Sequence, residues 1–181
     1  MELWVELRAL QLNLAKVEEP IRNRVAESVL IQLELTELID VDCVELDFTS
    51  WLHEGLVVIE KDFRLKVDEL DVIEFKGKGV GLKISGDAIV PDWAWMVIMA
   101  RLEGAKFVVV GGIKGALNEA LRMGIEKINL EEFRDKRVIV RGCDSASGPE
   151  GLLLFQAKLQ PIVKSIMFGE ACSTVPVFKK K

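Results

Sequence analysis

The most reactive side chains of this chain stand in short polar turns that follow apolar runs. Cys143 and Cys172 each come after a predicted strand that ends in glycine. A thiol in such a turn becomes a candidate nucleophile when a neighbouring helix N-terminus lowers its pKa, and a second thiol can serve as its partner. Asp87 or Asp144 can then orient the thiol or exchange protons. The candidate catalytic residues are therefore Cys143, Cys172 and Asp87.

Small polar residues around these positions are the candidate ligand contacts. Glycine lets a ligand approach the backbone, and the helices that follow such turns offer unpaired amides to an anion. The alternative is that both cysteines only fill space at strand ends, since the single histidine, His53, is distant in sequence. No spacing of potential metal-binding residues predicts a metal site, and the sequence has no dinucleotide-binding fingerprint that would indicate a cofactor. The predicted ligand-binding residues are Ser85, Gly86, Asp144, Ser173 and Thr174.

Composition limits the class of protein. The chain has 181 residues, of which half are hydrophobic and 29% are charged, as in ordinary globular domains. A net charge of -5 argues against a nucleic-acid partner, which requires clustered Lys and Arg. Three widely spaced cysteines do not form a secreted disulfide framework, and no apolar run is long enough to cross a membrane. The sequence therefore predicts a cytoplasmic protein.

Alternating patterns predict the elements that position these turns. Apolar runs with strand periodicity alternate with helical patterns, which favours an α/β fold with a mostly parallel sheet and helices on both faces. The N-terminal strands extend the sheet, as an antiparallel edge or a small lobe. We expect the run at 105–110 to be a buried strand and the helix at 93–102 to be deeply buried. The strands are predicted at 31–35, 44–48, 80–84, 105–110, 137–141, 161–168 and 174–178, and the helices at 61–75, 93–102, 113–121 and 149–159.

The domain organisation follows from the same patterns. Residues 1–20 form an N-terminal extension with an apolar helical seam, and residues 21–181 form a single α/β domain. The seam packs on its own domain or joins two copies of the chain.

Gly124 is expected to end the helix that begins near residue 113. If the later strands lie parallel in one sheet, the turns after residues 84, 110, 141 and 168 converge on one edge, where α/β folds bind ligands.

Several stretches also resemble a bacterial family of unknown function. The resemblance covers most of the chain from about residue 21, and members of that family have no assigned activity or catalytic residues. The family usually has a cysteine where this chain has Ile84, which argues against a site of three thiols. The matching stretches are Asn23–Ala26, Glu60–Arg64, Ser85–Pro91 with Trp93–Ala94, Gly142–Cys143 and Lys164–Pro176.

Two functional hypotheses follow. The first is a small-molecule site at the strand ends, with a thiol-dependent reaction as its enzymatic form. The second is a non-catalytic interaction protein that acts as a homo-oligomer. The residues alone leave open which of the two is correct and whether the protein is an enzyme.

Overall fold

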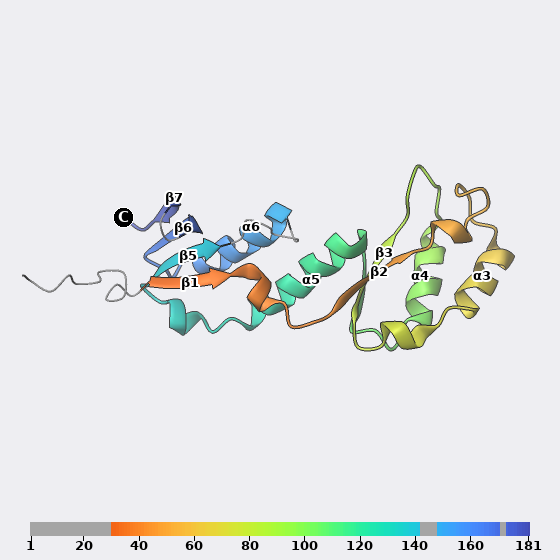
Figure 1. Cartoon of the computed structure of the whole chain (residues 1–181), viewed down its shortest axis with the longest axis horizontal. Coiled ribbons are helices and arrows are strands. Elements are labelled where there is room, and N and C mark those ends of the chain that lie inside the picture. The colour runs from red at the N-terminus through yellow and green to blue at the C-terminus, as the bar shows by residue number, and fades with distance from the viewer. Residues whose placement is uncertain (1–29, 142–147, 171–172) are drawn as a thin grey trace, which may run out of the picture. The chain divides into compact units, whose positions relative to one another are not determined.

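The computed structural model describes residues 30–141, 148–170 and 173–181. The predicted N-terminal extension therefore lies outside the described residues. Strands and helices alternate along most of the described chain, and the α/β class is confirmed (Figure 1). The elements are β1 (Leu30–Glu34), β2 (Cys43–Asp47), α3 (Glu60–Asp68), β3 (Gly79–Lys83), α4 (Asp92–Arg101), β4 (Phe107–Val110), α5 (Gly112–Lys127), β5 (Arg137–Arg141), α6 (Gly148–Leu159), β6 (Ser165–Glu170) and β7 (Ser173–Lys179).

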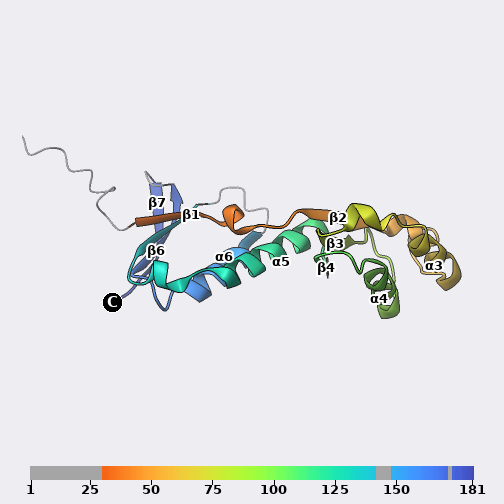
Figure 2. The same ribbon diagram turned by 90° about the horizontal axis from the view of Figure 1, so that it is seen from below.

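The strands form two sheets instead of the single sheet that we expected (Figure 2). The order β2-β3-β4 makes a three-stranded parallel sheet, and β1-β5-β6-β7 makes a four-stranded sheet in which β5 and β6 are parallel. Strand β7 pairs antiparallel with β6 at an edge of this sheet, where a proline such as Pro176 is tolerated. We expected β4 and β5 to lie in the same sheet, and this prediction is therefore wrong.

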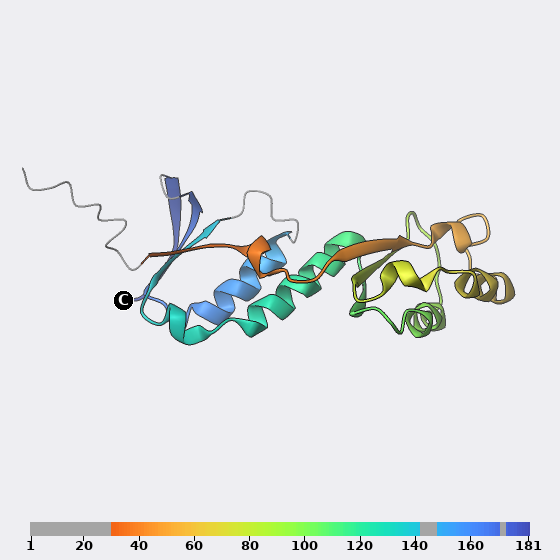
Figure 3. The same cartoon turned by 60° about the horizontal axis from the view of Figure 1, so that its bottom comes forward.

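Helix α5 explains the division into two sheets. Its 16 residues span about 24 Å, whereas the four residues of β4 span about 13 Å. The helix begins against β2 and β3, and Leu121 and Ile125 near its other end are buried in the core of the four-stranded sheet (Figure 3). A helix this long carries the chain beyond the sheet it started on, so β5 joins different strands.

The three-stranded sheet has its core on the face covered by α3 and α4. Alternate residues of β2 and β3 point into this core, where Phe48 is fully buried and makes an edge-to-face contact with Trp95 at 5.1 Å. The expectation that α4 is deeply buried is wrong, because only its sheet side is covered. Met96 and Met99, on its other sides, are 72% and 50% exposed. The cluster of buried or half-buried aromatic rings contains Phe48, Trp51, Phe63, Trp93 and Trp95.

The opposite face of this sheet receives the start of α5. Gly81 in β3 lies so close to Gly112 that a Cβ at position 81 would overlap the Gly112 carbonyl group and stand 3.1 Å from its Cα. Glycine at position 81 is therefore required for α5 to approach the sheet. Gly112 itself has a φ of 63°, in the left-handed region where glycine has no steric penalty.

An arginine joins α4 to the end of α3. The Arg101 side chain donates hydrogen bonds of 3.2 Å to backbone carbonyls just at and beyond the end of that helix. The helix that we expected to continue to Phe75 therefore ends at Asp68, and Asp71 then caps a short 3₁₀ turn by accepting from the Ile73 amide at 3.0 Å. The three carbonyls belong to Val67, Asp68 and Leu70.

The four-stranded sheet has a separate core beneath α5 and α6. Here the predicted stop of α5 at Gly124 is wrong, since the helix continues to Lys127. Gly124 instead lets the helix approach the Leu38 carbonyl, where a Cβ would overlap it. The largest fully buried side chains of this core are Leu121, Val138, Phe155, Leu159 and Val163.

None of the helices in the described ranges has the length and apolar character needed to cross a bilayer. The cytoplasmic location remains a prediction.

Candidate functional site

The carboxyl ends of β2, β3 and β4 lie side by side, because the three strands are parallel. Ser85, Gly86 and Asp87 follow β3, and Gly111 and Gly112 follow β4, so these two predicted turns do meet at one sheet edge. Ser173 and Thr174 belong to β7 in the other sheet. The predicted convergence of all four turns on one edge is therefore wrong, because the strands are divided between two sheets.

Cys143, Asp144 and Cys172 lie outside the described residues, so their roles remain predictions. The described strands around them are paired, with Val140 opposite Phe168 in the parallel β5–β6 ladder. The last residues of these two strands, Arg141 and Glu170, form an ion pair of 3.2 Å.

A groove of about 570 Å³ opens at the carboxyl end of the three-stranded sheet. Apolar side chains from β3, β4 and α4 form one wall, and charged side chains and the first turn of α5 form the other. Grooves of this size at the carboxyl ends of parallel strands are the usual ligand sites of α/β domains. It is lined by Glu45, Leu82, Lys83, Ile84, Trp95, Val110, Gly111, Gly112, Ile113 and Lys114.

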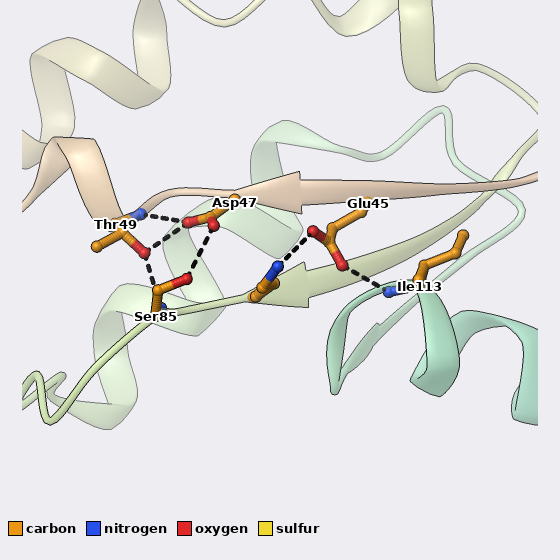
Figure 4. Close-up of polar contacts among 6 residues, drawn as sticks. Glu45, Asp47, Thr49, Ser85 and Ile113 are labelled. Atoms are coloured by element: carbon orange, nitrogen blue, oxygen red, sulfur yellow. Dashed lines mark hydrogen bonds and ion pairs between the residues drawn. The ribbon is translucent and has the colours of Figure 1, made fainter. Parts of the chain in front are cut away.

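Glu45 holds together the charged wall of this groove (Figure 4). One carboxylate oxygen accepts from the Lys83 ammonium at 2.9 Å, and the other accepts from the Ile113 amide at 3.0 Å. The hydrogen bond from Lys83 and then the one from Ile113 lower the pKa of Glu45, and Glu45 raises the pKa of Lys83. A carboxylate therefore already occupies the start of α5, supplied by the protein itself.

A second polar cluster lies farther along the same edge, beyond the ends of β2 and β3 (Figure 4). Asp47 accepts from the Thr49 amide at 2.9 Å, from the Thr49 hydroxyl at 2.5 Å and from the Ser85 hydroxyl at 3.2 Å. These bonds, led by that of the Thr49 hydroxyl, lower the pKa of Asp47. The Ser85 amide donates to the Thr49 hydroxyl at 2.8 Å. The predicted ligand contact Ser85 thus already ties the end of β3 to the end of β2.

Asp87, the third candidate catalytic residue, is exposed in the loop after β3 and does not line the groove. Gly86 has a φ of 80° and serves the turn itself. Within the described residues, no group of three or more His, Cys, Asp or Glu side chains is arranged to hold a metal ion.

Sequence reasoning missed the residues that line the groove. Glu45 and Lys83 were predicted only to lie in two of the strands, and Trp95 only to lie in a deeply buried helix. Their pairing depends on the register that sets β2 beside β3, which a single sequence does not show. The glycine pair before Lys114 was the one available signal, because it opens a helix directly after a strand.

Residues 19–180 match the sequence model of a family described as "Protein of unknown function (DUF2480)". The chain belongs to this family. Membership in DUF2480 confirms the resemblance to an uncharacterised family. That the family is bacterial remains a prediction. No curated protein and no solved structure matches the chain. The DUF2480 match assigns no activity, so the function has to be argued from the groove.

Proposed function

We propose that this protein binds a small molecule that has an apolar body and one anionic group, a carboxylate or a phosphate, in the groove at the ends of β2, β3 and β4. The observation that carries the proposal is the composition of the two walls. Trp95, Ile84 and Val110 offer an apolar wall, and Lys83 and Lys114 stand on the other side.

The charges of the groove favour an anion. Lys83 is paired with Glu45, whereas Lys114 has no carboxylate partner among the described residues. Its ammonium group is therefore available to a ligand, and hydrogen bonds between charged groups are the stronger ones in proteins. Glu45 neutralises Lys83 and occupies the Ile113 amide, so Lys114 is the group of this wall that remains for a ligand anion. A ligand anion beside Lys114 would extend this arrangement.

The test is a binding titration of the full-length protein with small aromatic and branched-chain carboxylates, phosphate monoesters and inorganic phosphate. Calorimetry measures affinity, and tryptophan fluorescence, to which Trp95 contributes as one of four tryptophans, gives a second signal. We expect Lys114→Gln to weaken binding about tenfold, the effect of losing roughly 1.4 kcal/mol from a charged hydrogen bond. Lys61→Gln is the matched control, since Lys61 is also exposed near the start of a helix but lies outside the groove.

Two results would contradict this proposal. One is that no compound of the panel binds. The other is that Lys114→Gln and Lys61→Gln bind with the affinity of the unaltered protein. A preference for carboxylates over phosphate esters, or the reverse, identifies which anionic group the groove takes.

A thiol-dependent reaction at the ends of β5 and β6 is a second candidate. The observation in its favour is that parallel pairing and the Arg141–Glu170 ion pair bring together the two strand ends that precede Cys143 and Cys172. The reactivity of these thiols relative to Cys43 tests it.

A further inference from the structure

Strand β4 has the sequence of a central strand and the position of an edge strand. Its four residues are all apolar, and such runs are typical of strands with neighbours on both sides. Yet β3 is its only strand partner among the described residues, and all four of its residues are partly or largely exposed. The prediction that 105–110 is a buried strand is therefore wrong for the single chain. A second neighbour would explain the sequence.

The other sheet edges are protected in the usual ways. Edge strands avoid unwanted pairing with charged residues and proline. The edge strand β2 carries Glu45 and Asp47, β1 carries Glu34, and β7 carries Pro176 and Lys179. Strand β4 carries neither a charge nor a proline, so its edge is open to pairing.

The backbone of β4 has hydrogen-bonding groups directed outward. The Gly111 amide donates to the Leu82 carbonyl of β3 at 3.0 Å. Because peptide groups alternate in direction along a strand, those of Val108 and Val110 face away from β3. They offer donors and acceptors to a further strand.

Apolar side chains border the same edge. Val110 is 63% exposed, and Met99 on α4 is 50% exposed. Met99 stands one helical turn from Trp95, which lines the groove together with Val110, so Met99 lies on the side of α4 nearest this edge. The edge and its surroundings therefore form one apolar surface.

We propose that a second copy of this chain pairs its β4 antiparallel with this β4, about a two-fold axis at Val108. Two copies of the same strand in antiparallel pairing present the same residues to each other, so the contact is self-complementary. The β2-β3-β4 sheets of the two copies then join into one continuous sheet. The four residues of β4 bring no charge to the interface of a chain whose net charge is -5, and Lys106, just before the strand, brings a positive one.

The second copy also contributes to the groove, a point that rests on the proposed function. With Val108 on the axis, Lys106 of the second copy lies opposite Val110, which lines the groove. The dimer thus adds an ammonium group at the open side of the site, near Lys114. Dimerisation and binding of an anionic ligand then stabilise each other.

The first experiment measures the mass of the full-length protein by sedimentation over a wide range of concentrations. We expect a dimer for the unaltered chain, and Met99→Glu should raise its dissociation constant at least about tenfold by placing a carboxylate in the interface. Val175→Glu is the matched control, because Val175 is 64% exposed on β7 of the other sheet. It should leave the dimer unchanged.

The second experiment cross-links the two copies at Val108, the residue on the two-fold axis. Val108→Cys places two thiols on residues whose Cα atoms are about 5.5 Å apart in such a pair, within the range that a disulfide spans. Mild oxidation should give covalent dimers of Val108→Cys that are linked at position 108, whereas Val175→Cys and the unaltered chain should form no more dimer than their native thiols produce. The proposal would be overturned by a monomer at every concentration. It would also be overturned by a dimer whose dissociation constant is unchanged by Met99→Glu and that does not cross-link at position 108.

The two proposals can fail separately. A monomer that binds the anionic compounds refutes the dimer and leaves the groove proposal standing. A dimer that cross-links at Val108 but binds no compound of the panel refutes the groove proposal and leaves the interface standing.

Discussion

Replacing Gly81 with alanine tests whether α5 is seated on the three-stranded sheet as described. The added methyl group meets the carbonyl of Gly112, which is backbone in the first turn of α5 and cannot rotate away as a side chain would. The helix start has to move off the sheet by roughly 1.5 Å to restore van der Waals contact, because the added Cβ would overlap the Gly112 oxygen. The Ile113 amide moves with it and weakens its hydrogen bond to Glu45.

The expected cost is at the upper end of what overpacking causes, about 3 kcal/mol, because the obstructing atoms are main chain. For a chain of this length that corresponds to a fall in Tm of about 10 °C. Chemical denaturation followed by tryptophan fluorescence measures the free energy of unfolding, since three tryptophans lie in the core next to this sheet.

Gly104→Ala is the matched control. A Cβ at Gly104 meets only the Cγ of Lys76, at an ordinary 3.7 Å, so its stability should change by less than about 0.5 kcal/mol. If Gly81→Ala unfolds at the same denaturant concentration as the unaltered protein, the close approach of α5 to β3 is incorrect. Equal losses in both variants would also refute the reasoning, because they would show a general effect of replacing glycine.

Three further predictions concern other contacts. Arg101→Met should lower the free energy of unfolding by about 2 kcal/mol, since it leaves three carbonyls at the end of α3 without their charged donor; an unchanged denaturation midpoint would contradict this. Glu45→Gln should be less stable than the unaltered protein at neutral pH, and the difference should vanish in acid: the folded-state pKa of Glu45 is lowered, so its contribution is present above its ordinary pKa and is lost as the pH falls through the lowered value. A difference in stability that persists in acid would refute that assignment. Cys43 should alkylate more slowly than Cys143 and Cys172 in mass-spectrometric time courses, because burial raises the pKa of the Cys43 thiol; three equal rates would count against a thiol-dependent site.

Local patterns were enough to locate most elements of the fold. Apolar alternation predicted β1 and β2, and the β-branched run of residues 137–141 predicted β5. The start of α4 directly after Pro91 and the edge location of β7, which contains Pro176, both agree with the positions of the prolines. These features depend on residues close together in the chain, which is why a single sequence reveals them.

Pairing between distant strands was not predictable in the same way. Residues 105–110 have the same composition whether they lie in the middle of a sheet or at its edge. The division into two sheets depends on how far α5 extends, and Gly124 was read as a helix end when its role is close packing against Leu38. The groove residues were missed for the same reason, since Glu45 and Lys83 are 38 positions apart and meet only through strand register.

Helix α5 packs against both sheets. Its first turn is fixed against Gly81 and Glu45, while Leu121 and Ile125 fill the core on which β5 and β6 pack. Substitutions in its first turn must therefore suit the three-stranded sheet, and substitutions at residues 121 and 125 must suit the other core. The sequences of the two halves cannot change independently, because each half has to pack against the same helix.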